Sequence, residues 1–502
     1  MTESVYALLA SHTVEDPGQP AVVDAQGLID RRGLLDEVNR LAAELSRHRP
    51  ADRLVGVHLE RGRLLVAALL AVEAVGAAFL PLDPAVPRSR LRAFLLDSGA
   101  DLLVTTSGSA GLLGAGPWKT VAADQPGPKR EWSPAPDGDR VAYIMYTSGS
   151  TGAPKGVAVG QRSLQAFLAM MDAEVREEAP ERVGERQIWQ SVCSVGFDLS
   201  VIDFLWATSR GHTVVIGPND PTGLFESGFA DGTPAGHVTH AVLTPSTARL
   251  LCHDPATLAG LRRARVLMIG GEPFPSELVD LLRPDDAGPR LINVYGPTEA
   301  TVWITRTEVS TSSAPPGFAG NSVAPAAFHV LDDDLSPLQA SSEGTVFLSG
   351  PGIAFGYWRQ GGRTAAAFLP DPTGTSGSRM YDTGDLGVVE EEGGLTIRGR
   401  TDRQVKIRGN RVELGEVEHA ICIDPVVRSA ACIVTAVAGM TAFVVAGETS
   451  TASVGEQILA RLVDRLPRYM IPNKVIVVSE MPRVPNGKID RAALERLLGA
   501  AG

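Results

Sequence analysis

Residues 146–156, which read YTSGSTGAPKG, gather three glycines, five hydroxyl groups and one lysine. Glycines let a backbone come close to phosphate oxygens, and hydroxyl and ammonium groups donate hydrogen bonds to them. The spacing differs from that of a P-loop, which needs a glycine, four residues and then Gly-Lys-Ser/Thr. A Ser/Gly linker is the alternative, but the apolar strands predicted on both sides favour a phosphate loop. Its expected donors are Thr147, Ser148, Gly149, Ser150, Thr151, Gly152 and Lys155.

Lysine is rare in this chain, which has six lysines against forty arginines. A compact ammonium and a planar guanidinium are not interchangeable in a tight site, so the remaining lysines are informative. Lys155 lies in the phosphate loop, and Lys488 follows a Pro-Asn-Gly turn in PNGKIDR. A lysine after Asn-Gly is more often an exposed turn residue, so the residues around Lys488 leave its role open.

Composition and charge exclude several classes of protein. The 502 residues carry a net charge of −12 and 44% hydrophobic residues, so nothing global supports nucleic-acid binding. The cysteines show no metal-ligand spacing and indicate reduced thiols of a cytoplasmic protein. The N-terminal residues show no basic start followed by an apolar core, so we expect no signal peptide. The apolar stretch from Leu64 contains Glu73 and ends at Pro81, so we expect a buried helix and no membrane span.

Apolar runs that end in glycine-rich loops recur along residues 1–401. RVAYIMY precedes the phosphate loop, ARVLMIGG precedes a helix that begins near Ser276, and RLINVY precedes GPTEA. This alternation predicts an α/β fold with mostly parallel sheets flanked by helices, and ligands bind such folds beyond the carboxyl ends of the strands. Residues 402–502 instead have short elements, which predict a small α+β domain with a boundary at Asp402.

Seven motifs occur in the order found in the adenylate-forming superfamily, and the chain resembles the amino-acid adenylation domains of nonribosomal peptide synthesis. The resemblance covers nearly the whole chain. It departs from the family after the phosphate loop, where GVAVGQRSL offers Gln161 and Arg162, and it is loose in two later segments. The motifs are YTSGSTGAPKG at 146, FDLS at 197, YGPTE at 295, YDTGD at 381, GRTDRQVKIRGNRVELGEVE at 399, LPRYMIP at 466 and NGKIDR at 486.

The resemblance implies an ATP site and names its residues. Tyr295 would stack on adenine, with Asn293 and Gly271 nearby. Thr298 would contact the reacting phosphate, and Glu299 would bind Mg²⁺, because a carboxylate plus phosphate oxygens is the usual magnesium environment. The ribose residues would be Asp385 and Arg400. Lys488 would be the catalytic cation that bridges the substrate carboxylate and the α-phosphate.

The resemblance also implies an amino-acid pocket. Asp198 and Lys488 would hold the α-ammonium and carboxylate groups. The indole N–H of Trp303 is the only polar atom in the remaining wall, and bulky side chains leave little depth. We therefore expect a small aliphatic substrate, with L-alanine first and glycine, serine, valine or 2-aminobutyrate behind it. The wall residues are Leu199, Ile202, Val242, Met268, Gly270, Val294, Val302 and Trp303.

The implied reaction has two halves, formation of an aminoacyl-AMP and transfer to the phosphopantetheine thiol of a carrier protein. A small mobile C-terminal domain would rotate about Asp402 between them, and Gly409 would let the pantetheine arm pass close to the backbone. We expect a free-standing ligase that charges a separate acyl or peptidyl carrier protein. An acyl- or aryl-CoA ligase and a non-catalytic carrier-binding scaffold stay open as alternatives. Asp198 opposes the first alternative, and Lys488, Glu299 and Asp385 oppose the second.

Overall fold

In the computed structural model, the chain folds into two compact units. The large unit comprises Met1–Asp83, Leu95–Met145 and Gly156–Thr401, and the small unit comprises Pro84–Phe94, Tyr146–Lys155 and Asp402–Gly502. The structure describes residues 4–48, 53–127, 132, 139–149, 153–178, 186–217, 237–284, 287–310, 315–435, 438–447, 454–484 and 489–500.

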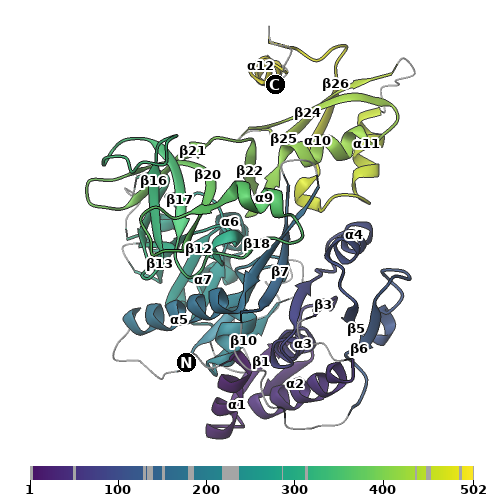
Figure 1. Ribbon diagram of the computed structural model, residues 1–502, viewed down its shortest axis with the longest axis vertical. Coiled ribbons are helices and arrows are strands. Elements are labelled where there is room, and N and C mark those ends of the chain that lie inside the picture. The colour runs from purple at the N-terminus through teal and green to yellow at the C-terminus, as the bar shows by residue number, and fades with distance from the viewer. Residues whose placement is uncertain are drawn as a thin grey trace. The chain divides into compact units, whose positions relative to one another are not determined.

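The first sheet of the large unit combines parallel and antiparallel strands (Figure 1). Strands β1, β10, β9, β11, β12 and β13 pair in parallel, as the apolar runs predict. The sheet then continues through antiparallel strands that the sequence motifs did not reveal. In spatial order its strands are Ala327–Leu331 (β16), Gly344–Ser349 (β17), Arg379–Val389 (β20), Leu395–Arg400 (β21), Phe318–Ser322 (β15), Thr305–Glu308 (β14), Arg290–Tyr295 (β13), Val266–Gly270 (β12), His240–Leu243 (β11), Ile188–Ser191 (β9), Thr213–Ile216 (β10), Pro20–Asp24 (β1) and Gly27–Asp30 (β2), with Phe368–Pro370 (β19) paired to β20.

The second sheet carries the strands on both sides of the phosphate loop. Its β3, β4, β5, β6 and β7 pair in parallel, and β18 adds to β8 antiparallel. Every residue of β3, β4, β5 and β8 is buried, which is typical of strands in the interior of an α/β fold. In spatial order the strands are Gly356–Tyr357 (β18), Lys155–Gly160 (β8), Val141–Thr147 (β7), Ala78–Pro81 (β4), Leu54–Val57 (β3), Leu102–Thr105 (β5) and Lys119–Ala122 (β6).

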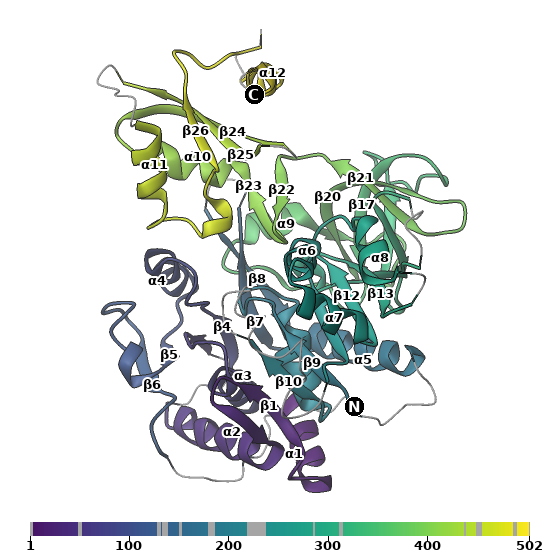
Figure 2. The ribbon, with the colours of Figure 1, turned by 180° about the vertical axis from the view of Figure 1, so that it is seen from behind.

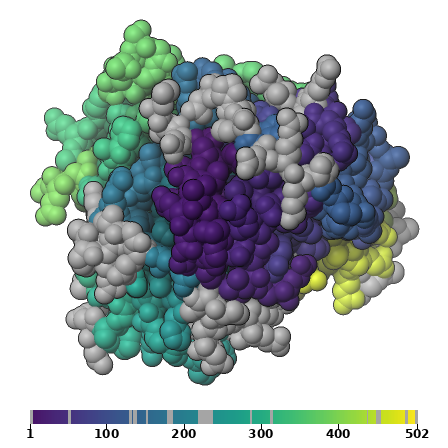
Figure 3. Space-filling view, turned by 90° about the horizontal axis from the view of Figure 1, so that it is seen from below, coloured from purple at the N-terminus to yellow at the C-terminus, as the bar shows by residue number. Residues whose placement is uncertain are grey.

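Helices pack against these sheets. Figures 1 and 2 show α1, α2 and α3 side by side, and in Figure 3 the N-terminal residues form a continuous part of the surface. The Asp30 side chain caps α2 by accepting from the Gly33 N–H at 2.7 Å. The helices are Val5–Glu15 (α1), Arg31–Ser46 (α2), Arg63–Ala74 (α3), Arg88–Ser98 (α4, which spans the boundary between the units), Gln161–Glu178 (α5), Pro245–Cys252 (α6), Pro255–Arg263 (α7), Glu277–Leu282 (α8) and Gly361–Ala367 (α9), with short helices at Ser107–Ser109, Ile202–Ala207 and Thr298–Ala300.

Helix α3 confirms the prediction of a buried, Ala-rich helix. It is 12 residues long, and every residue from Leu65 to Ala74 is buried. Glu73 accepts hydrogen bonds from the Tyr6 N–H and the Gln161 amide, both at 3.3 Å, so its carboxylate is satisfied inside the core. Within the described ranges, no helix combines the length and apolar composition needed to cross a bilayer.

The C-terminal part of the small unit has the short α+β elements predicted from the sequence. Helix α10 and strands β24 and β25 enclose a core that includes Val417, Ile421, Cys432 and Val444. The elements are Gln404–Ile407 (β22), Asn410–Glu413 (β23), Leu414–Cys422 (α10), Val427–Thr435 (β24), Gly439–Ala446 (β25), Val454–Leu462 (α11), Arg468–Met470, Lys474–Val477 (β26) and Arg491–Ala500 (α12).

Candidate functional site

The phosphate loop lies between two strands, as the sequence predicts. β7 ends at Thr147, β8 begins at Lys155, and the Thr147 hydroxyl lies 3.5 Å from the Lys155 carbonyl oxygen. Ser148 and Lys155 are both buried. Ser150, Thr151 and Gly152 lie outside the described residues.

Three of the predicted nucleotide-binding residues meet at one hydrogen-bonded cluster. The Tyr295 hydroxyl donates to Asp385 Oδ2 at 2.5 Å, and the Arg400 guanidinium pairs with Asp385 Oδ1 and donates to the Thr383 carbonyl at 3.0 Å. Asp385 and Arg400 face each other across the β20–β21 ladder, which places a carboxylate and a guanidinium together. Burial raises the pKa of Tyr295, and the neighbouring Asp385 charge raises it further.

The other two predicted nucleotide residues belong to neighbouring parallel strands: Asn293 lies within β13, and Gly271 directly follows β12. Asn293 pairs with Ile269 in register, and its side-chain amide donates to the Phe318 carbonyl at 2.8 Å. Gly271 follows β12 with a φ of 86°, a conformation that glycine adopts without strain. The carboxyl edge of the parallel strands is where ligands bind in α/β folds.

Two buried carboxylates lie close together beside this edge. Asp198 is 3% exposed and Glu299 is fully buried. The pKa of Asp198 is raised to about 7, mainly by burial; a hydrogen bond from the Thr298 hydroxyl opposes this rise, and the Glu299 charge adds to it. Glu299 Oε1 accepts from the Tyr357 hydroxyl at 2.9 Å, a contact that the sequence did not indicate. Two anions in a buried site favour cationic ligands, because each carboxylate raises the cost of keeping the other ionised.

The donor set fits a Mg²⁺ ion at Glu299 that shares its coordination with phosphate oxygens. Mg²⁺ is usually held by one or two carboxylates together with substrate phosphates and water. In the part of the chain that the structure describes, no group of three or more His, Cys, Asp or Glu side chains is placed to hold a metal. The role of Glu299 as a ligand of a magnesium ion that arrives with ATP stays a prediction.

The predicted pocket wall is apolar and buried. Val242 and Met268 are paired neighbours on β11 and β12, and Gly270 is opposite Val294 on β13. A Cβ at Gly270 would come within 2.5 Å of Val294 Cγ2, so this position excludes a side chain. All the other wall residues belong to one buried hydrophobic cluster: Leu199, Ile202, Val242, Met268, Val294, Val302 and Trp303.

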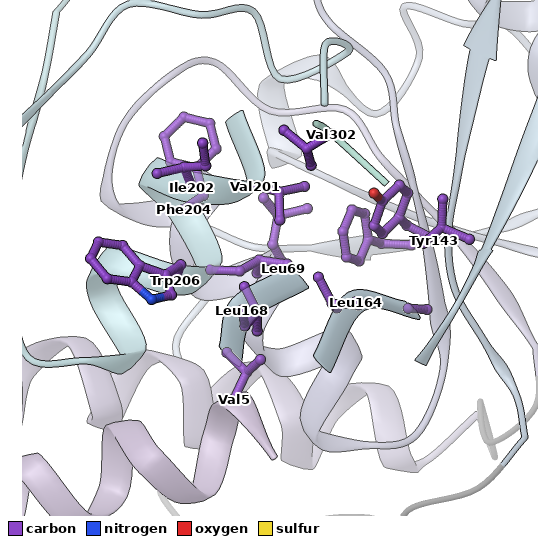
Figure 4. Close-up of a cluster of buried hydrophobic side chains, with 14 of the residues drawn as sticks. Val5, Leu69, Tyr143, Leu164, Leu168, Val201, Ile202, Phe204, Trp206 and Val302 are labelled. Carbon is purple, nitrogen blue, oxygen red and sulfur yellow. The ribbon is translucent and has the colours of Figure 1, made fainter. Parts of the chain in front are cut away.

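A π-helix, Ile202–Ala207, presents part of this wall. Figure 4 shows Ile202 and Val302 in the cluster that also contains Tyr143 and side chains of α3 and α5. Trp303 packs edge-on against Phe167 with ring centroids 5.9 Å apart, and its buried indole N–H has no hydrogen-bond partner. π-Helical turns often occur at functional sites, although no feature of the sequence indicated one here.

Comparisons with known proteins identify the family of this chain. A family model described as AMP-binding enzyme matches residues 9–358, and a model of the C-terminal domain of AMP-binding enzymes matches residues 416–488. The chain belongs to the AMP-binding enzyme family. The members of this family that it matches include nonribosomal peptide synthetases, which confirms the resemblance to their adenylation domains. The chain is thus an ATP-dependent, AMP-forming ligase.

Two relatives have the same sequence identity to this chain but differ in how much of their own length it covers. The chain is 35% identical to the phosphinothricin tripeptide synthetase PhsC of Streptomyces viridochromogenes, over 99% of this chain and 46% of PhsC. It is also 35% identical to novobiocin biosynthesis protein H of Streptomyces niveus, over 95% of this chain and 80% of that protein. The chain spans between 6% and 46% of the length of four of the relatives, PhsC included.

Solved structures share the fold over nearly the whole chain. Holo-PA1221, a nonribosomal peptide synthetase protein containing adenylation and PCP domains, has a TM-score of 0.81 and 25% identity, over 99% of this chain and 84% of that one. A double mutant of o-succinylbenzoate CoA synthetase from Bacillus subtilis has a TM-score of 0.83 and 20% identity, over 98% of both chains. The predicted fold class of this AMP-binding enzyme is therefore confirmed.

Two of the residues predicted to act from the C-terminal part, Asp402 and Gly409, are described in the small unit. Asp402 is its first residue after Thr401, and its Oδ1 accepts from the Gln404 N–H at 3.1 Å. Gly409 follows Arg408 in the tight turn between β22 and β23, where both residues have positive φ, of 78° and 50°. Lys488 lies outside the described residues. The roles of these three residues stay predictions.

Proposed function

We propose that this AMP-binding enzyme activates a small aliphatic amino acid, with L-alanine first, and transfers it to the phosphopantetheine thiol of a carrier protein. The observation that carries the proposal is the buried pair Asp198 and Glu299 beside an apolar wall. Asp198 would pair with the α-ammonium of the substrate, and Glu299 would face Mg²⁺ and phosphate. An aryl or fatty acid has no ammonium group and would leave Asp198 buried without a cation.

In the first half-reaction, a carboxylate oxygen of the amino acid attacks the α-phosphorus of ATP, and the bond to the leaving pyrophosphate breaks. Lys488 would reduce the repulsion between the two reacting anions. Tyr295, Asp385 and Arg400 would hold the adenosine, since their hydrogen bonds to one another fix a carboxylate where ribose hydroxyls can donate to it. In the second half-reaction, the pantetheine sulfur attacks the acyl carbon and AMP leaves.

The apolar wall supports a small side chain. A charged or amide side chain would lose its water without gaining partners, at a cost of about 1–3 kcal/mol for each unsatisfied group. Trp303 offers the one free donor in this wall, so serine is the polar substrate that the wall could accommodate. Discrimination among alanine, glycine and valine should be weak, because one methylene in an apolar pocket is worth about 1–3 kcal/mol.

Transfer to a carrier protein is supported by the similarity to PA1221, whose structure contains adenylation and PCP domains. The CoA synthetase shares the fold alone. Incubation with ATP, radiolabelled alanine and either a holo-carrier protein or free CoA separates the two acceptors. Label on the carrier supports the proposal, and label on CoA alone would assign the chain to the CoA ligases.

We place the rotation between the two half-reactions at Asp402. Asp402→Pro would restrict φ to about −65° and hinder the change in backbone conformation. One half-reaction should then survive while the other is lost, as measured by pyrophosphate exchange and by thioester formation from supplied adenylate. Full activity in both assays would exclude a rotation centred at Asp402.

A further inference from the structure

The start of the phosphate loop is bound by acceptors of its own unit, the small unit. The Ser148 hydroxyl donates to the Arg411 carbonyl at 2.7 Å, and the Gly149 N–H donates to Glu416 Oε2 at 3.3 Å. Arg411 lies on β23, and Glu416 lies in the first turn of α10. Two donors that the loop would offer to a phosphate therefore have protein acceptors.

Glu416 is fixed in this position by a buried ion pair. Its side chain is 3% exposed and pairs with the guanidinium of Arg90, which is 10% exposed. The same guanidinium lies 5.4 Å from the Phe94 ring centroid, and Phe94 stacks on Tyr146 at 4.3 Å with the rings nearly parallel. Burial raises the pKa of Glu416, and the Arg90 charge lowers it. The ion pair with Arg90, whose guanidinium also contacts Phe94, thus holds the Glu416 carboxylate beside the loop.

A carboxylate oxygen and a phosphate oxygen are both anionic acceptors for a backbone N–H, so they cannot occupy the Gly149 donor together. We propose that Glu416 replaces a phosphate oxygen at Gly149, so that pyrophosphate and Glu416 compete for the start of the phosphate loop. This inference rests on the proposed function, in which the loop holds the leaving pyrophosphate. When pyrophosphate leaves, Glu416 accepts from the Gly149 N–H, which would otherwise lose its hydrogen-bond partner.

If Glu416 and pyrophosphate compete for the Gly149 N–H, the Glu416 carboxylate lowers the apparent affinity of the enzyme for pyrophosphate. Removing the Glu416 carboxylate should strengthen pyrophosphate binding by about fivefold or more, the lower end of typical coupling between two sites. Removing the carboxylate should also slow thioester formation. After pyrophosphate has left, the Gly149 N–H would have lost its acceptor, so the loop without pyrophosphate would be less stable. A purely structural role for Glu416 would not strengthen binding of an anion.

The test compares Glu416→Ala and the isosteric Glu416→Gln with the wild-type chain. Glu413→Gln is a matched control, because Glu413 is also buried, lies near Glu416 and accepts from the Gln404 amide at 2.7 Å. The dissociation constant of inorganic pyrophosphate is measured by calorimetry on each full-length protein, and the KM for pyrophosphate is measured in amino-acid-dependent exchange.

Tighter pyrophosphate binding in both Glu416 variants, with Glu413→Gln close to wild type, supports the inference. Equal or weaker binding in the Glu416 variants, an equal gain in Glu413→Gln, or no binding to the wild-type chain overturns it. Absence of exchange with every amino acid would instead count against the proposed function, while the calorimetric comparison would still decide the role of Glu416.

Discussion

Replacing Asp198 by asparagine should stabilise the ligand-free enzyme while abolishing its activity. The native pKa of Asp198 is raised from the 3.8 of an unperturbed aspartate to about 7, mainly by burial. An acid whose pKa is higher in the native state binds more protons there, so stability falls as pH rises from about 4 to about 7. Asparagine has nearly the same shape and no charge, and it removes this penalty.

The magnitude follows from the shift of about three pKa units. Each unit corresponds to about 1.4 kcal/mol, so Asp198→Asn should gain about 4 kcal/mol at pH 8, where the penalty is fully developed. At pH 5 native Asp198 is protonated while the unfolded chain is ionised, and the gain should shrink to about 2 kcal/mol. Repulsion from Glu299 is one of the causes of this shift, so its relief is already part of the expected gain.

Thermal unfolding of the two proteins without ligands, at pH 8 and pH 5, measures this difference. The variant should have the higher Tm at pH 8, with a smaller advantage at pH 5. Pyrophosphate exchange on the same samples should be lost, since the substrate ammonium has no counter-charge. A Tm equal to or below that of the wild-type chain at pH 8 would refute the argument that Asp198 is held in an unfavourable charged state.

Three further predictions concern the same site. The KM for the amino acid should rise about tenfold between pH 8 and pH 6, because the substrate ammonium binds the ionised form of Asp198, whose pKa is about 7; a flat profile would contradict this. Lys488→Ala should lose about 10²–10³ in exchange rate yet keep thioester formation from supplied adenylate, and unchanged exchange would remove Lys488 from the mechanism. Trp303→Ala should admit larger aliphatic amino acids in a substrate panel, whereas an unchanged panel would place Trp303 outside the pocket.

Local patterns predicted the parts of the site that depend on neighbouring residues. The apolar runs located β7, β12 and β13, and the polar loops that follow them could be assigned to the carboxyl edges of strands. Tyr295 and Asp385 were assigned to one nucleotide only through the family resemblance. Their hydrogen bond depends on the antiparallel half of the first sheet, whose strands carry no equally clear pattern.

Contacts between residues distant in the sequence could not be predicted. Glu416 appeared in the sequence only as one residue of the motif that begins at Gly399, and its partner Gly149 lies 267 positions away. Tyr357, whose hydroxyl donates to Glu299, is also remote from it, at 58 positions along the chain. A tyrosine or glutamate alone does not indicate its partner, because many folds can bring such groups together.

Amino-acid-dependent exchange of labelled pyrophosphate into ATP tests the central claim most directly. The purified chain is assayed with Mg²⁺ and, separately, alanine, glycine, serine, valine, phenylalanine, aspartate and lysine. The account predicts exchange with alanine and weaker exchange with the other small amino acids. A clear preference for phenylalanine, aspartate or lysine, or exchange with none of the seven, would contradict it.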